Sequence, residues 1–173
     1  MVTESLRLLV AISGAEDPAL AGFVGRVVAS GADGLELTLL HVVDADARAL
    51  AGGFPMRRTP WPAPSKGATE RRLEQADEAG ATALLESWRV RFAGVLPPGA
   101  KIDPMVRSGH PEREIVAAAV ELHVDSIVLC ARPGPGAAEP GPRSVGHVAR
   151  FVLDHSPVPV LLVRGLLRGP GGA

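Results

Sequence analysis

Hydrophobic residues along this chain gather in short runs that are separated by segments of helix length. The runs are rich in Val, Ile and Leu and extend over 6–12, 35–43, 101–106, 126–130 and 158–163. Continuous apolar runs of this length are typical of strands buried on both faces of a parallel sheet. The pattern therefore predicts five strands, each except the last followed by a helix.

Start signals for two helices follow the strand runs. Asp17 before Pro18 predicts an N-cap residue with a proline at the first helical position. Pro111, followed by Glu112 and Glu114, predicts a second start with acidic residues in the first turn.

Apolar stripes at three- or four-residue steps predict the faces that three helices turn to the core. The longest helix is expected within 69–95, and shorter ones within 111–123 and 144–155. The expected stripe positions are Leu73, Ala76, Gly80, Leu84, Trp88 and Phe92 in the first, Ile115, Ala118, Ala119 and Leu122 in the second, and Val145, Val148, Val152 and Leu153 in the third.

Strands that alternate with helices through right-handed crossovers build a doubly wound sheet. The chain is therefore expected to form a single three-layer α/β/α sandwich, with one domain over 1–164 and a flexible Gly-rich tail over 165–173. The connection over 44–67 is long and Pro-rich, and connections of this kind are often lids or contact surfaces.

Composition argues against a nucleic-acid-binding protein and against a membrane-spanning one. A net charge of -1 provides no excess of Lys and Arg, so a nucleic-acid partner is not expected. The longest apolar runs reach about seven residues, far below the roughly 20 that cross a bilayer, so no membrane span is expected. Cys130 is the only cysteine, and the first residues do not resemble a signal peptide. These features predict a cytoplasmic protein.

The C-terminal third contains the candidate binding site that the sequence pattern predicts. A strand over 126–130, a Gly- and Pro-rich loop and a helix over 144–155 form a unit that presents backbone N–H groups to phosphate in open α/β sheets. The loop contains Pro133, Pro135, Pro140 and Pro142. Because proline has no N–H, the sequence predicts a nucleotide site whose hold on phosphate is weakened.

Five stretches in order resemble the universal stress protein family. They are LLVAISGAE over 8–16, LLHVVD over 39–44, GHPEREIV over 109–116, the segment over 117–129 and HSPVPVLLVR over 155–164. The resemblance implies a five-stranded parallel sheet of order 3-2-1-4-5, the HUP or adenine nucleotide α hydrolase-like fold. It also implies a homodimer that pairs through the last strand, with Val158, Val160 and Leu162 at the interface.

Members of this family that bind ATP place glycine, two residues, glycine, nine residues and then Gly-Ser or Gly-Thr after the fourth strand. Counting back from the last strand, Gly146 takes the final glycine position, Gly136 the middle one and Pro133 the first. Counting forward from the fourth strand, Cys130 and Pro133 take the first two positions instead. The resemblance therefore implies an insertion of about three residues within 131–143.

Two further positions depart from the family pattern. His147 stands where the Ser or Thr would face phosphate, and Ser13 stands where nucleotide-binding relatives have an aspartate. Each charged hydrogen bond that is lost weakens the binding free energy of a nucleotide by about 1.5–3 kcal/mol. A protonated His147, or Arg132 or Arg143, could supply charge to phosphate in compensation.

If the site is retained, the resemblance places eleven residues around the nucleotide. They are Ala11, Ser13, Val42, Leu129, Cys130, Gly134, Gly136, Arg143, Gly146, His147 and Val148. ATP is the cofactor that this arrangement would imply, and no other cofactor is expected.

The main hypothesis for function is a non-enzymatic stress-response or regulatory module that acts through an unidentified protein partner. The alternative is an ATP-binding protein that acts as a nucleotide-dependent switch, in which the ligand orders 131–143.

A second alternative is an adenylating enzyme, since 10–18 also resembles the Ser-Gly-Gly-x-Asp-Ser loop of ATP pyrophosphatases. Ala15 stands at the second glycine position of that loop and Pro18 at its final serine position, so two groups that would contact pyrophosphate differ. An N-cap at Asp17 explains the same residues more simply. The five histidines show no metal-ligand spacing, and no residues are placed as a catalytic set. An enzyme and a metal site are therefore not expected.

Overall fold

The computed structural model describes residues 5–13, 18–28, 34–44, 66–131 and 145–164. Its elements in chain order are β1 (Leu6–Ala11), α1 (Pro18–Val28), β2 (Leu35–Asp44), α3 (Lys66–Ala93), β3 (Lys101–Gly109), α4 (Pro111–Glu121), β4 (Ser126–Ala131), α5 (His147–His155) and β5 (Val160–Arg164). The strands form one parallel five-stranded sheet of order β3-β2-β1-β4-β5. The predicted fold and strand order are confirmed.

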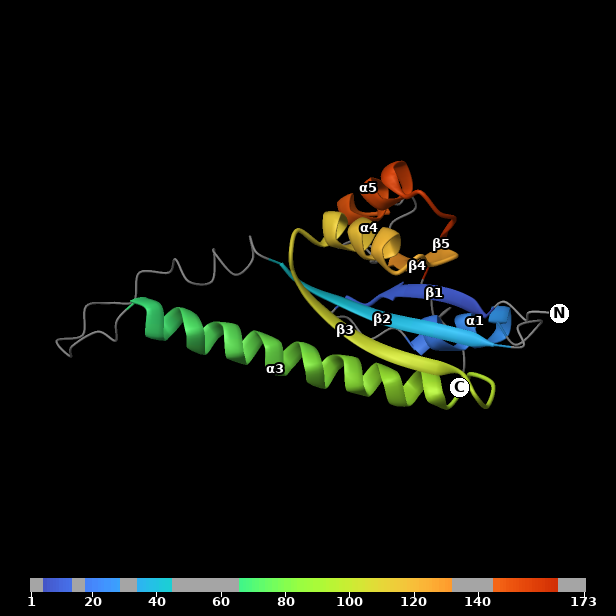
Figure 1. Ribbon diagram of the computed structural model, residues 1–173, viewed down its shortest axis with the longest axis horizontal. Coiled ribbons are helices and arrows are strands. Elements are labelled where there is room, and N and C mark those ends of the chain that lie inside the picture. Colours follow the sequence, from blue (N-terminus) through green and yellow to red (C-terminus); the bar gives the residue numbers. More distant parts are fainter. Residues whose placement is uncertain (1–4, 14–17, 29–33, 45–65, 132–144, 165–173) are drawn as a thin grey trace, which may run out of the picture.

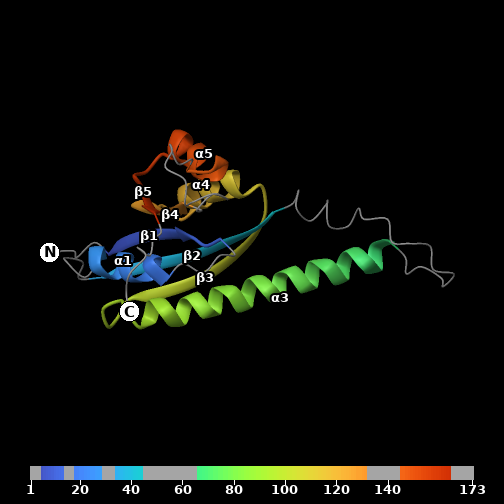
Figure 2. The ribbon, with the colours of Figure 1, turned by 180° about the vertical axis from the view of Figure 1, so that it is seen from behind.

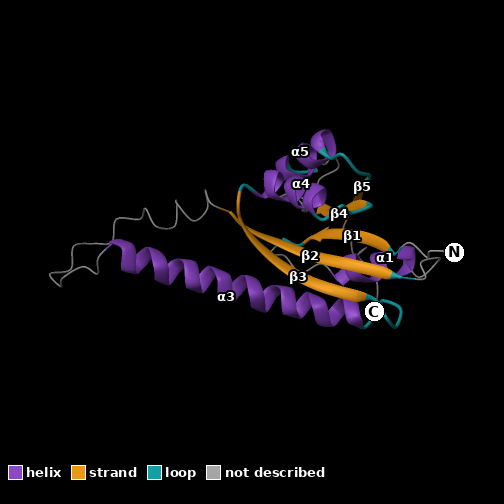
Figure 3. Ribbon diagram, in the orientation of Figure 1, coloured by secondary structure: helices purple, strands orange, loops and turns teal. Residues whose placement is uncertain are grey.

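The sheet lies between two helical layers. Helices α1 and α3 cover one face and α4 and α5 the other (Figures 1 and 2). Colouring by secondary structure shows the strands between these layers (Figure 3). Side chains of a strand alternate between faces, so Leu8 and Val10 pack toward α1 and α3 while Leu9 packs toward α4 and α5. The central strand β1 is thereby buried on both faces.

Helix α3 is longer at its start than the apolar stripe predicts, and its buried face differs. The helix begins at Lys66 rather than at 69, and it extends past the carboxyl ends of β2 and β3 (Figure 1). Gly80 is exposed, whereas Ala81 and Leu85 are buried with Trp88 and Phe92. The predicted stripe was wrong at Gly80 because α3 packs on the sheet through Ala81 and Leu85, each one residue after a predicted position. The side chains of Leu73 and Ala76 lie outside the described residues.

Helices α4 and α5 and the residues beside them place most of the predicted positions against the core, fully or partly buried. Ile115, Ala118 and Ala119 are buried and Leu122 packs against them at the end of α4. In α5, Ala149 and Val152 are buried, but Leu153 is 44% exposed. The prediction for Leu153 was wrong because this short helix faces the core with Ala149 and Val152, which lie one turn apart. Leu153 follows Val152 directly and therefore points away from that face.

Two strands differ from their predicted limits by more than one residue. Strand β3 continues to Gly109 rather than ending at 106, and it pairs with β2 along this extension. Strand β5 begins at Val160 rather than at 158. The Ser156 hydroxyl donates to the Val158 carbonyl and accepts from the Val158 N–H, so this backbone forms a local turn before the strand. β5 is an edge strand, and its pairing with a second copy stays a prediction.

Arg107 of β3 fastens α4 to the sheet. Its guanidinium lies 3.5 Å from Glu114 and also contacts Glu121, which is two turns further along α4. The side chain of Arg107 is 19% exposed. The guanidinium lowers the pKa of the Glu121 carboxyl through a hydrogen bond and charge attraction. This ion pair holds the helix whose first turn forms one wall of the pocket described below.

Replacing Glu121 with glutamine is expected to lower stability at neutral pH and to have a smaller effect in acid. Because the pKa of Glu121 is lowered in the folded protein, its contribution is present above the ordinary carboxyl pKa and is lost as the pH falls through the folded value. The measurement is the urea midpoint of both proteins at about pH 7 and about pH 3. A difference in midpoint that is the same at both pH values would contradict the role of this carboxylate.

Within the residues that the structure describes, no helix is both long and apolar enough to span a membrane.

Candidate functional site

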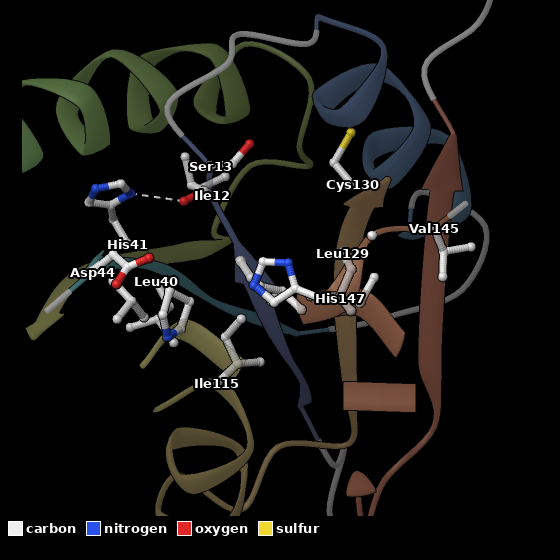
Figure 4. Close-up of a pocket in the computed structure, with 16 residues that line it drawn as sticks. Ile12, Ser13, Leu40, His41, Asp44, Ile115, Leu129, Cys130, Val145 and His147 are labelled. Atoms are coloured by element: carbon white, nitrogen blue, oxygen red, sulfur yellow. Dashed lines mark hydrogen bonds between the residues drawn. The ribbon is translucent and has the colours of Figure 1, made fainter. Parts of the chain in front are cut away.

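A cavity of about 260 Å³ opens at the carboxyl ends of β1, β2 and β4 (Figure 4). The N-terminal turns of α4 and α5 close its other sides, and the described residues that line it are Ala11, Ile12, Ser13, Leu40, His41, Val42, Asp44, Pro111, Ile115, Leu129, Cys130, Val145, Gly146, His147, Val148 and Ala149. Strand β1 pairs with β2 on one side and with β4 on the other. The cavity therefore lies where the order of the strands reverses, which is where open α/β sheets bind ligands.

Hydrogen bonds between β1 and β2 fix the floor of the cavity. The N–H of Ile12 donates to the Leu40 carbonyl at 2.8 Å. Nδ1 of His41 lies 2.9 Å from the Ile12 carbonyl oxygen (Figure 4). A carbonyl only accepts, so Nδ1 of His41 is the protonated ring nitrogen. These two contacts tie the end of β1 to β2 and place Ser13 at the mouth of the cavity.

Helix α5 begins on a glycine conformation that brings its first amides to the cavity. Gly146 is the N-cap, with φ 86 and ψ 156, and no side chain caps the helix. The Gly146 carbonyl accepts from the N–H of Arg150 at 3.1 Å, which is the first bond of the helix. The N–H groups of His147, Val148 and Ala149 precede that bond and have no acceptor within the helix. A helix start of this kind favours a negatively charged group.

The side chains around the cavity are mostly apolar, and the charged groups are few. His41 and Asp44 come from β2, Cys130 from β4 and His147 from α5. The ring of His147 points into the cavity in the close-up view (Figure 4). Neither Lys nor Arg is among the described lining residues. An apolar cavity with a small number of polar groups is the usual form of a small-molecule site.

The cavity brings together eight of the eleven residues that the sequence assigned to a nucleotide site. They are Ala11, Ser13, Val42, Leu129, Cys130, Gly146, His147 and Val148. Gly134, Gly136 and Arg143 lie outside the described residues, as do Arg132 and the loop prolines. That these eight residues bind a nucleotide stays a prediction.

Several lining residues were not predicted. His41 and Asp44 flank Val42 at the end of β2, and Pro111 and Ile115 lie in the first two turns of α4. The rule that parallel strands end at the same edge of a sheet could have found His41 and Asp44. The contribution of α4 depends on how that helix packs on the sheet, which the sequence pattern does not give.

A metal site was not expected from the spacing of the histidines. Among the residues that the structure describes, no three His, Cys, Asp or Glu side chains come close enough together to hold a metal ion.

The parallel sheet of order 3-2-1-4-5, with helices on both faces and a cavity at its strand switch point, defines an α/β protein of the HUP-like class. Within that class, the chain belongs to the universal stress protein family, whose family model matches residues 5–164. The predicted family membership is confirmed. No curated protein matches the sequence.

Solved structures of the family share the fold. Universal stress protein UspA from Lactobacillus plantarum is 26% identical with a TM-score of 0.58, and the match covers 92% of this chain and 97% of that one. A universal stress protein from Archaeoglobus fulgidus is 18% identical with a TM-score of 0.61, covering 92% and 98%. A family protein from Arabidopsis thaliana with AMP bound is 16% identical with a TM-score of 0.56, covering 94% and 93%.

Proposed function

We propose that this protein is a non-enzymatic regulatory module of the stress response that binds an adenine nucleotide weakly and acts through a protein partner. The nucleoside part occupies the apolar cavity, and the phosphate lies at the start of α5. The observation that carries this proposal is the cavity of about 260 Å³, which joins apolar walls to the first amides of α5. A volume near the lower end of the usual range for ligand sites, about 300–1,000 Å³, suits a ligand of nucleoside size.

Two features support a weak hold on the phosphates. The described lining residues provide no Lys or Arg side chain to pair with a phosphate. The sequence of the loop before α5 contains four prolines, which have no N–H to donate. Binding would then depend on burial of the base and ribose, and additional phosphates would add little affinity. The Arabidopsis relative with AMP bound supports an adenine nucleotide as the ligand class.

The orientation of His41 supports a binding role rather than catalysis. Ser13, His41 and Asp44 all line the cavity, and these are the residue types of a hydrolytic triad. In a triad, Nδ1 of the histidine donates to a carboxylate, which orients the ring and stabilises its positive charge. Here Nδ1 of His41 is bonded to the carbonyl of Ile12. The ring therefore ties two strands together and lacks the carboxylate partner of a general base.

Calorimetric titration of AMP, ADP and ATP into the purified protein tests the proposal. The three nucleotides are expected to bind with similar dissociation constants of the order of 10⁻⁴ M, because the second and third phosphates are poorly held. Gly146→Val is expected to abolish binding, since a side chain strains the positive φ that starts α5 and so shifts the first amides of the helix. Gly80→Val, at an exposed glycine of α3, is the matched control and is expected to bind normally.

Each other outcome points to a different function. Micromolar affinity that increases from AMP to ATP would contradict the weakened site and favour a nucleotide-dependent switch. Turnover of ATP to AMP and pyrophosphate would contradict the non-enzymatic role. Absence of binding by all three nucleotides would contradict the ligand class.

A further inference from the structure

We propose that His147 is the residue with which the pocket distinguishes phosphorylated from unphosphorylated nucleosides, and that it does so only when its imidazole carries a proton. This inference rests on the proposed function, because it concerns the same pocket. It goes further in assigning phosphate recognition to one side chain and in making the affinity depend on pH.

The position of His147 places a titratable group at the phosphate end of the cavity. His147 is the first residue of α5, directly after the N-cap Gly146, and its own N–H is one of the amides without a helical acceptor. Its side chain is exposed and its ring points into the cavity (Figure 4). A phosphate bound by the first amides of α5 would therefore meet the imidazole of the same helix turn.

Among the described lining residues, the charges leave this role to His147. A phosphate monoester carries about −1.5 to −2 charges near neutral pH. No Lys or Arg is among the described lining residues, so positive side-chain charge can come there only from the imidazoles of His41 and His147. Nδ1 of His41 is already bonded to the Ile12 carbonyl at the end of β1. Histidine side chains generally change charge between about pH 5 and 8, which makes phosphate binding proton-dependent.

The charged and titratable groups near His147 come from its own helix and from the strands that line the cavity. Asp44 of β2 lines the cavity, and its carboxylate would repel a phosphate, which a protonated His147 would offset. The positive end of α5 lies at His147, and Arg150 follows one turn along the helix. His41 of β2 and Cys130 of β4 also line the cavity, while α4 contributes only Pro111 and Ile115, which do not titrate. A bound phosphate attracts a protonated imidazole, so we expect proton uptake by His147 to accompany binding.

The test compares dissociation constants of AMP and adenosine at about pH 5.5, 6.5 and 8.0 for the wild type, His147→Gln and His147→Lys. The ratio of variant to wild type at each pH removes the titration of AMP itself. His155→Gln is the matched control, because His155 is an exposed histidine at the other end of α5. Thermal unfolding of each variant shows that the fold is kept.

At about pH 5.5, His147→Gln is expected to weaken AMP binding about tenfold, which is the size of a lost charge-assisted hydrogen bond. At about pH 8.0 the variant and the wild type are expected to bind AMP about equally, because imidazole then carries little charge. His147→Lys is expected to bind AMP tightly at all three pH values. Adenosine binding is expected to be the same in every protein.

A variant-to-wild-type ratio for AMP that does not change with pH would overturn the inference while leaving the proposed function intact. Equal losses for adenosine and AMP would also overturn it, because His147 would then contact the nucleoside. The same losses in His155→Gln would overturn it by showing a general effect on α5. Wild-type protein that binds neither AMP nor adenosine at any pH would contradict the proposed function and, with it, this inference.

Discussion

Alanine in place of Gly146 is expected to lower the free energy of unfolding by about 1–3 kcal/mol, the usual cost of a backbone conformation that only glycine adopts freely. The combination of φ 86 and ψ 156 at Gly146 lies in that region. No heavy atom lies within 4 Å of the place where a Cβ would stand, so the cost comes from backbone strain and not from a clash. Urea denaturation measures the loss.

Gly80→Ala provides the matched comparison for this prediction. Gly80 lies in α3, and a Cβ there would also meet no atom within 4 Å, but its φ is in the ordinary helical range. The change to alanine is expected to stabilise the protein by about 0.5–1 kcal/mol, because alanine favours helix more than glycine does. If both alanine variants had the stability of the wild type, the conformation described for Gly146 would not be required by the fold.

Truncation of Trp88 to alanine is expected to have the largest effect, a loss of about 3–5 kcal/mol in the free energy of unfolding. The side chain of Trp88 is 1% exposed and lies between α3 and the sheet, with its ring centroid 5.9 Å from that of Phe92. Removal of this ring leaves a cavity that the rigid sheet cannot close. The measurement is the same urea titration.

Two other variants show whether the effect comes from packing at that position. Val90→Ala, on the exposed side of the same helix, is expected to change stability by less than about 0.5 kcal/mol, because Val90 is 61% exposed. Trp88→Phe is expected to cost less than Trp88→Ala. Nε1 of Trp88 is buried and has no hydrogen-bond partner among the described residues, so phenylalanine keeps part of the ring and removes that unsatisfied donor. Equal losses in Trp88→Ala and Val90→Ala would contradict the anchoring role of Trp88.

The order of elements could be predicted from the sequence because each central strand is a continuous apolar run, as burial on both faces requires. The order of strands in the sheet came from the family resemblance, since periodicity alone does not select a neighbour. The predictions were wrong where contacts between elements determine the end of a strand or the buried face of a helix. Strand β3 continues to Gly109 because β2 offers it a partner, and α3 buries Ala81 rather than Gly80 because of the way that it packs on the sheet.

The residues at the start of α5 were predicted more completely than the residues that form the walls of the cavity. Gly146 and His147 could be placed because the resemblance to the family gives the spacing of its glycine motif before the last strand. The bond from His41 to Ile12 could not be predicted, because it joins residues from two strands and depends on their register. The wall formed by Pro111 and Ile115 likewise depends on the position of α4. Arg107 of β3 holds that helix in place through its contacts with two glutamates of α4.

The placement of β1 between β2 and β4 has a consequence for synthesis of the protein. The N–H of Arg7 donates to the carboxylate of Asp125 across a separation of 118 residues, and β4 follows directly after that contact. A nascent chain on the ribosome therefore carries β1 with one edge unpaired until β4 has emerged. Parallel pairing over such a separation is slow, and an unpaired apolar strand is prone to aggregate. Chaperones that bind extended apolar segments thus have a long interval in which to engage this chain before it closes.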